Sequence, residues 1–157
     1  MSSEIAQQDE MTKVDGLLIP LHEKQLILPN VTVAEIIPYR VPVNEGVDSN
    51  WLLGTIEWRN VNIPIISYEA LNGGAIPAVE GARLAVLNAT SAKRDLPFYA
   101  ILIQGIPKLT HIHEEDVVAV EAMRSGPFDE MTVSLFGEQA MIPNLEMIEN
   151  ELLQHVG

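Results

Sequence analysis

Apolar and polar residues alternate with a period of two along much of the chain, which favours strands over helices. The clearest case spans residues 53–58 and 61–66, where successive side chains would face opposite sides of a sheet. Arg59 and Asn60 separate these two runs, and asparagine tolerates the positive φ angles that a two-residue turn requires. The pattern therefore predicts a β-hairpin that reverses at Arg59 and Asn60.

Other apolar runs predict further strands. They lie at residues 14–21, 25–28, 83–88, 98–103, 106–112, 117–120, 131–136 and 139–142. The run 98–103 is almost continuously apolar, which is typical of a strand buried on both faces. Gly137 and Glu138 predict a two-residue turn, with glycine first, between the last two runs. Many short strands joined by short turns indicate a mainly β fold of the barrel or sandwich type.

Helical patterns are few. We expect a short helical turn at residues 33–36, which Asn30 or Thr32 could cap. A second short turn is expected at residues 69–72. The best helix follows Asn144, a favourable N-cap residue, because apolar side chains then recur at spacings of three and four. They form one stripe, which consists of Leu145, Ile148, Leu152 and Val156.

Composition and charge narrow the classes of function. Hydrophobic residues make up 47% of the 157 residues, and nine basic residues face twenty-two acidic ones, for a net charge of −13. An acidic surface repels phosphate backbones and anionic lipids, so we expect no nucleic-acid or membrane partner. A partner protein with a basic face would be complementary in charge. The chain contains no cysteine, which excludes disulfides and cysteine catalysis.

The N-terminal residues lack the basic and apolar regions that are typical of a signal peptide. Residues 1–12 are polar and acidic and are predicted to form a flexible tail, followed by a single domain over residues 13–157. No signal-peptide pattern and no apolar run of the length that spans a bilayer is present. We therefore expect a cytoplasmic protein.

Two histidines are the best candidates for chemistry. His111 and His113 lie two apart in a predicted strand, so both imidazoles would share a face and could point at one metal ion. His22 and His155 are distant in sequence, and no third ligand is fixed by spacing. The alternative is an exposed polar turn. Carboxylates occur in surface-like runs that indicate solvation, and no catalytic or phosphate-binding motif is present. No cofactor is therefore expected.

The aromatic residues near the hairpin have two interpretations. Trp51 and Tyr68 are expected to pack in the core, since aromatic side chains fit pleated surfaces. Trp58, next to Arg59 at the hairpin end, could equally pack in the core or anchor an interface, where tryptophan and arginine are enriched.

The hairpin region resembles the CheW-like domain family of bacterial chemosensory proteins. Eight residues stand where that family has its motif: Gly54, Ile56, Glu57, Arg59, Ile63, Pro64, Ile65 and Ile66. The flanking segments 25–28, 36–38 and 141–145 also resemble family segments. The similarity covers most of residues 14–155.

The resemblance implies a fold and a function. The fold would be two small SH3-like β-barrel lobes of five strands each around a shared core, with short helices and a C-terminal helix. The function would be non-catalytic coupling of chemoreceptors to a CheA-type histidine kinase, through the receptor signalling domain and the regulatory domain of the kinase. Arg59 would contact a partner, together with its neighbours Glu57, Trp58 and Asn60. Gly54 and Pro64 would serve the fold.

Three departures from the family pattern point to a divergent member. Asn60 replaces the glycine that usually follows the arginine, Ser67 and Tyr68 stand where aspartate and leucine are common, and Gln104 replaces an aspartate. The chain is similar to accessory coupling proteins of chemosensory systems that control type IV pili and twitching motility. Its partners could therefore differ from those of a standard coupling protein.

Overall fold

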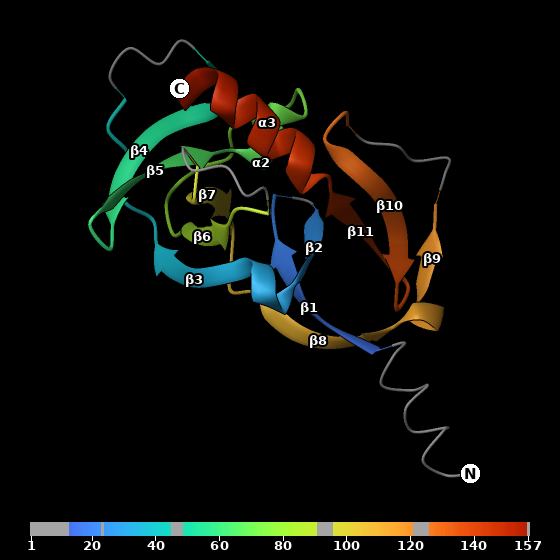
Figure 1. Cartoon of the computed structure of the whole chain (residues 1–157). Coiled ribbons are helices and arrows are strands. Elements are labelled where there is room, and N and C mark those ends of the chain that lie inside the picture. Colours follow the sequence, from blue (N-terminus) through green and yellow to red (C-terminus); the bar gives the residue numbers. More distant parts are fainter. Residues whose placement is uncertain (1–12, 23, 45–48, 91–95, 121–125, 157) are drawn as a thin grey trace.

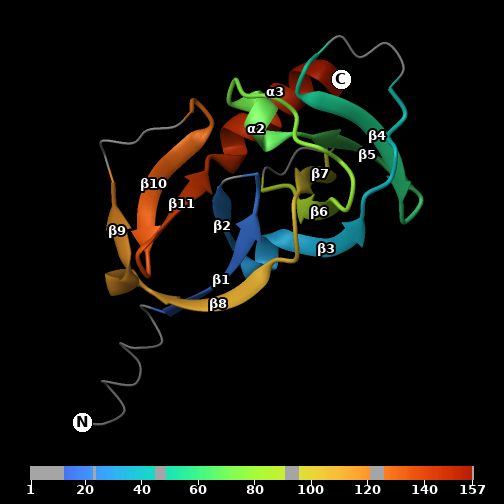
Figure 2. The same cartoon turned by 180° about the vertical axis from the view of Figure 1, so that it is seen from behind.

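Two curled β-sheets and four helical segments make up the regular structure of the described residues (Figures 1 and 2). The structure is a computed structural model, and it describes residues 13–22, 24–44, 49–90, 96–120 and 126–156. The tail predicted at residues 1–12 lies outside the described residues. The strands are β1 (Lys13–Pro20), β2 (Gln25–Pro29), β3 (Val33–Pro38), β4 (Leu52–Trp58), β5 (Val61–Ile66), β6 (Arg83–Asn88), β7 (Phe98–Ile103), β8 (Lys108–His113), β9 (Val117–Ala119), β10 (Asp129–Leu135) and β11 (Glu138–Pro143).

The chain builds the two sheets in an interleaved order. One sheet has the strand order β8-β1-β2-β11-β10-β9, and the other has the order β3-β6-β7-β5-β4. Each sheet is antiparallel except at one junction, β2 with β11 and β5 with β7. The chain thus starts in the first sheet, builds the second, and returns to complete the first. This arrangement confirms the mainly β fold with two SH3-like lobes, and the first lobe gains a sixth strand, the three-residue β9.

The C-terminal helix joins the two lobes. Helix α3 (Leu145–Val156) follows β11 of the first sheet and lies across the top of both lobes (Figure 1). It begins as predicted, because the side-chain oxygen of Asn144 accepts a hydrogen bond from the N–H of Met147 at 3.1 Å. Ile148 and Leu152 are completely buried in the larger hydrophobic cluster, which also holds side chains from strands of both sheets. The core is therefore shared between the lobes.

A second cluster fills the interior of the five-stranded lobe. It includes Ile56 and Trp58 of β4, Ile63 of β5, and Leu84 and Leu102 of β6 and β7. The predicted strand at residues 98–103 is confirmed as β7, whose residues Tyr99–Ile103 are all buried. A strand that packs on both faces needs this continuous apolar run.

The helical turn predicted at residues 33–36 is wrong. These residues belong to β3, which pairs in antiparallel fashion with β6, and the turn lies earlier, as a 3₁₀ helix at Asn30–Thr32. Local propensity in this segment was weak, and pairing with a strand about 50 residues away in the sequence decided its conformation. The turn predicted at residues 69–72 is present as the short helix α2 (Tyr68–Leu71), which Ser67 caps through its hydroxyl.

The turn of the last hairpin lies one residue earlier than predicted. Leu135 pairs with Glu138, so the turn residues are Phe136 and Gly137, with φ angles of 50° and 82°. Two successive positive φ angles are the mark of a type I′ turn, in which glycine is well suited to the second position. The bulky Phe136 occupies the first position at a steric cost.

The expectation that the carboxylates are solvated is wrong for two of them. Glu149 of α3 is fully buried, and its Oε2 atom accepts hydrogen bonds from the Tyr99 hydroxyl at 2.9 Å and from the N–H and hydroxyl of Thr90 at 3.0 Å each. Asp129 of β10 is also buried and accepts from the hydroxyl of Tyr68. Both carboxylates thus bond to a buried tyrosine that belongs to the five-stranded lobe, and they help to fix the two lobes against each other.

Candidate partner-binding site

The β4–β5 hairpin ends in a tight two-residue turn. Trp58 pairs with Val61, and the two residues between them, Arg59 and Asn60, have φ angles of 49° and 65°. The reversal predicted from the sequence is therefore confirmed, as a type I′ turn. Asparagine adopts this backbone conformation readily, whereas arginine does so at some cost, and the turn holds Arg59 outward at the tip of the hairpin.

Gly54 sits at an irregular point of β4. Its φ angle is 134°, and a Cβ atom there would lie 2.4 Å from the carbonyl oxygen of Val43. Val43 approaches so closely because it exchanges both backbone hydrogen bonds with Thr55, at 2.8 and 3.0 Å. Only a residue without a side chain fits this place.

Pro64 is buried in β5, where a proline would usually break the ladder of hydrogen bonds. Its register partner in β4 is Thr55. The backbone N–H and C=O of Thr55 both point toward Val43 and therefore away from β5. Thr55 and Pro64 therefore form a non-hydrogen-bonded pair of the antiparallel ladder. Because no N–H of residue 64 is needed to bond with β4, the proline loses no hydrogen bond between these two strands.

Trp58 packs in the interior of the five-stranded lobe. Its side chain is 6% exposed and meets the ring of Phe98 edge-on at a centroid distance of 4.9 Å. The indole Nε1–H donates to Oε1 of Glu35 at 2.8 Å, so the polar end of the ring is satisfied. Of the two sequence interpretations, core packing thus describes the indole itself.

Arg59 lies on the outer side of this indole. Its guanidinium carbon is 4.5 Å from the centroid of the Trp58 ring, within the range of a cation–π contact, and its side chain is 63% exposed. The Nη2 atom lies 3.6 Å from Oε2 of Glu35, whose other oxygen accepts from Trp58. One carboxylate therefore holds both the indole and the guanidinium, and Arg59 is oriented while it remains accessible.

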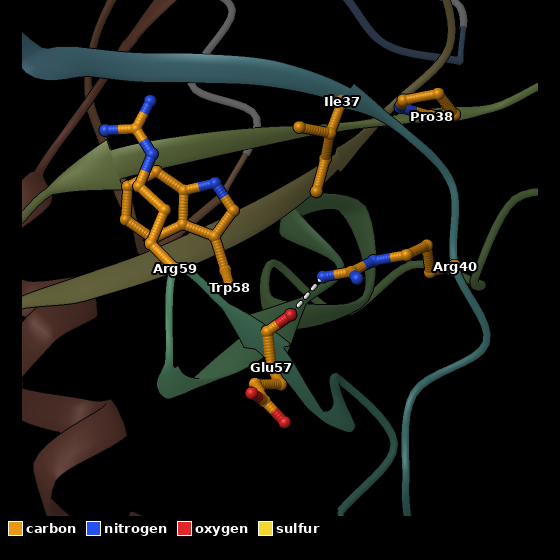
Figure 3. Close-up of a pocket in the computed structure, with 6 residues that line it drawn as sticks. All are labelled: Ile37, Pro38, Arg40, Glu57, Trp58 and Arg59. Carbon is orange, nitrogen blue, oxygen red and sulfur yellow. Dashed lines mark hydrogen bonds between the residues drawn. The ribbon is translucent and has the colours of Figure 1, made fainter.

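A shallow cavity of about 420 Å³ opens beside these side chains (Figure 3). Its lining consists of Ile37, Pro38, Arg40, Glu57, Trp58 and Arg59. The guanidinium of Arg40 donates to the backbone carbonyl of Glu57, while the carboxylate of Glu57 points away from it (Figure 3). The cavity has apolar walls with an arginine at each side, which suits contact with a protein surface that carries carboxylates.

The structure brings together some of the predicted site residues and adds others. Glu57, Trp58 and Arg59 line the cavity, whereas Asn60 is exposed at the turn. Sequence reasoning missed Glu35 and Arg40. Glu35 lies in the segment that was predicted to be helical, and its contact with the hairpin depends on β3 standing opposite β4 across the lobe.

The two histidines considered for a metal lie on β8. His111 and His113 face Asp15 and Lys13 of β1 in the register of the sheet, and Nδ1 of His111 lies 2.5 Å from Oδ1 of Asp15. The described residues contain no group of three or more histidine, cysteine, aspartate or glutamate side chains that could hold a metal ion. His155 packs edge-on against the ring of Trp51 at 5.1 Å. Trp51 and Tyr68 are both buried in the larger cluster, as predicted.

Comparisons with known proteins agree with this architecture. The chain is similar to the scaffolding protein TtCheW from Thermoanaerobacter tengcongensis, with a TM-score of 0.71, 14% identity and coverage of 84% of each chain. No curated protein matches it in sequence. Among the helices of the described residues, none is long and apolar enough to cross a membrane.

The sequence itself gives the assignment to a family. The sequence model of the CheW-like domain family matches residues 15–152, which is nearly the whole chain. Proteins of this family are scaffolds in chemosensory signalling and are not catalysts. The chain therefore belongs to the CheW-like domain family and is a non-catalytic protein.

Proposed function

We propose that the chain is a coupling adaptor that joins the signalling domain of a methyl-accepting chemoreceptor to the regulatory domain of a CheA-type histidine kinase. The observation that carries this proposal is the family match over residues 15–152, since CheW-like proteins couple receptors and this kinase.

The proposed contact is the tip of the β4–β5 hairpin. Arg59 supplies an exposed guanidinium that Glu35 and the ring of Trp58 hold in place. Asn60 and Glu57 flank it with exposed polar side chains. A pre-oriented guanidinium loses little conformational freedom when a partner carboxylate binds it, which favours affinity.

Purified partners test the proposal directly. A receptor signalling fragment and the kinase regulatory domain, each immobilised for biolayer interferometry, should bind the wild-type chain. The substitution Arg59→Glu reverses the charge at the hairpin tip and should weaken binding to one partner about tenfold or more, since the proposed attraction to a partner carboxylate turns into a repulsion. Lys108→Glu makes the same charge change at an exposed position on β8 of the other lobe and should leave binding unchanged.

Two outcomes would contradict different parts of the proposal. Binding of neither partner to the wild-type chain would exclude the coupling role. Equal effects of Arg59→Glu and Lys108→Glu would remove Arg59 from the contact and leave the role intact.

The pathway is proposed on the same grounds. The departures at Asn60 and Gln104 suit an accessory coupling protein of a cytoplasmic system that controls type IV pili. Deletion of the gene should then impair twitching motility without affecting pilus assembly. Normal twitching, together with impaired flagellar chemotaxis, would assign the protein to a chemotaxis pathway in place of this one.

A further inference from the structure

A single asparagine–glycine pair, Asn72–Gly73, occurs in the sequence, and it directly follows helix α2. Asparagine loses its side-chain nitrogen as ammonia most readily before glycine, because a residue without a Cβ atom lets its backbone nitrogen approach the side-chain carbonyl carbon. Each of the other asparagines precedes a residue that carries a side chain. Gly73 is exposed, and nothing lies within 4 Å of the position that a Cβ atom would occupy. Asn72 is therefore the asparagine with the greatest intrinsic tendency to deamidate.

The side chain of Asn72 bridges the two lobes. Its Oδ1 atom accepts a hydrogen bond from the backbone N–H of Phe128 at 2.8 Å, and its Nδ2 atom donates to Oδ1 of Asp129 at 3.2 Å. Asn72 and α2 follow β5 of the five-stranded lobe, whereas Phe128 and Asp129 lie at the start of β10 in the six-stranded lobe. Gly126 packs so closely on this side chain that a Cβ atom there would lie 2.5 Å from Cγ of Asn72. Both ends of the amide are thus engaged across the junction of the lobes.

This docked arrangement keeps the amide from reacting. The succinimide through which asparagine deamidates is a nearly planar five-membered ring, so its closure requires the nitrogen of Gly73 to eclipse the Cβ atom of Asn72. The ψ angle of Asn72 is 11°, which is far from that arrangement, and the N–H of Gly73 donates to the carbonyl of Ala70 at 3.0 Å. Closure needs a backbone rotation that breaks these contacts. It therefore proceeds from a locally opened state in which Asn72 has left Phe128 and Asp129.

A carboxylate at position 72 would not restore the bridge. It has no N–H with which to donate to Asp129, whose carboxyl group is buried and also accepts from the Tyr68 hydroxyl. Two carboxylates would then stand within hydrogen-bonding distance in a site that excludes most water, where like charges repel strongly. The docked state loses stability, whereas the opened state, in which both carboxylates are hydrated, does not.

We propose that Asn72 is a deamidation site that docking of the two lobes protects, and that the product of deamidation weakens this docking. The backbone nitrogen of Gly73 attacks Cγ of Asn72 and forms the ring C–N bond, while the side-chain nitrogen leaves as ammonia and takes the proton of the Gly73 amide. Water then opens the succinimide at either carbonyl, which gives an aspartate or an isoaspartate at position 72 and one added negative charge. Water is the sole co-reactant. A chain that opens at this junction is thus converted to a form that docks less well.

Peptide mapping by mass spectrometry of the full chain, aged at mildly alkaline pH, measures the reaction. Deamidation should be about tenfold or more faster in urea-unfolded chain than in native chain, because docking holds the amide. Tyr68→Phe removes a hydrogen bond to Asp129, and Gly126→Ala forces a methyl group against the side chain of Asn72, so each should raise the native rate about tenfold. Tyr39→Phe is the matched control, since it deletes a hydroxyl from a tyrosine packed against the other hydrophobic cluster and should leave the rate unchanged.

The effect of the product is measured separately by thermal unfolding. Asn72→Asp introduces the carboxylate without ageing, and it should lower Tm by about 4–8 °C because it replaces a donor to Asp129 by a like charge. Asn62→Asp adds the same charge at an exposed position of β5 and should change Tm by no more than about 2 °C. Chain that has deamidated during ageing, isolated by anion exchange, should show the lower Tm of the Asn72→Asp variant.

Three results would each overturn the inference. They are equal rates of deamidation at Asn72 in native and urea-unfolded chain, rates unchanged by both Tyr68→Phe and Gly126→Ala, and an Asn72→Asp variant as stable as Asn62→Asp. The inference does not depend on the adaptor role, because none of these measurements uses receptor or kinase. A failure of receptor and kinase binding in interferometry would therefore leave a positive result at Asn72 standing, and the reverse also holds.

Discussion

The buried carboxylate of Glu149 should make a large contribution to stability through its hydrogen bond with Tyr99. The substitution Tyr99→Phe removes only the hydroxyl, which donates to Oε2 of Glu149 at 2.9 Å, and it keeps the ring that packs in the core. Two further donors, both from Thr90, remain on the same oxygen. The change therefore removes the hydrogen bond from Tyr99 and leaves those from Thr90, without opening a cavity larger than one oxygen atom.

The expected loss follows from the burial of both groups. Tyr99 and Glu149 are each 0% exposed, so water cannot replace the missing donor. A hydrogen bond to a charged group contributes about 1.5–3 kcal/mol, and we expect Tyr99→Phe to lower the free energy of unfolding by about 2 kcal/mol. For a chain of this size, such a loss lowers Tm by about 4–8 °C. Burial and the neighbouring Glu149 also raise the pKa of Tyr99, so the phenol stays protonated and remains a donor at neutral pH.

Urea unfolding followed by tryptophan fluorescence measures the effect. Tyr39→Phe is the matched control, because it deletes the same hydroxyl from a half-buried tyrosine and should cost less than about 0.5 kcal/mol. In a Glu149→Gln background the carboxylate is absent, and Tyr99→Phe should then cost only about 1 kcal/mol. A loss for Tyr99→Phe no greater than that for Tyr39→Phe would refute the reasoning.

Three further predictions concern the turns and the strand irregularity. Gly54→Ala should lower the free energy of unfolding by about 2–4 kcal/mol, because the added Cβ strains the backbone and clashes with the carbonyl of Val43. Gly73→Ala is the control, since its φ is also positive, at 96°, but nothing lies within 4 Å of the added Cβ, and it should cost only about 1 kcal/mol. Equal losses in urea unfolding would show that the close approach of Val43 does not matter. Phe136→Asn should raise the free energy of unfolding by about 0.5–1 kcal/mol, because asparagine suits the first position of a type I′ turn and Phe136 is 61% exposed; an unchanged or lower Tm would argue against strain at this turn. Asn60→Gly should alter stability by no more than about 0.5 kcal/mol, because both residues tolerate a φ of 65°. In interferometry this change should shift the relative affinity for receptor and kinase, and unchanged affinities for both would exclude Asn60 from partner selection.

The elements that could be predicted from the sequence are those with strong local signals. The strands β6 and β7, the hairpin of β4 and β5, and the helix that starts after Asn144 all follow from side-chain period and from turn or cap residues. The prediction was wrong at β3, where the local pattern was short and weak, and by one residue at the turn of Phe136 and Gly137. In that turn the pairing of the flanking strands decided the register, and glycine took the second position.

The candidate site could be predicted only in part. The sequence pattern predicted Trp58 and Arg59 at the end of a hairpin, and the structure places them there. Their partner Glu35 lies 23 residues before Trp58, and nothing in the local pattern connects the two. The same holds for Asn72, whose amide binds Phe128 and Asp129 of the other lobe.

The sequence by itself determined the family, most of the strands and the turn at Arg59 and Asn60, because these depend on relations between residues a few positions apart. Only the tertiary structure decided which polar groups are buried and what they bind. Tyr99 and Glu149 are 50 residues apart, and Tyr68 and Asp129 are 61 apart. Such pairs form only when the two lobes dock, since burial then removes water as the competing partner and makes each hydrogen bond obligatory.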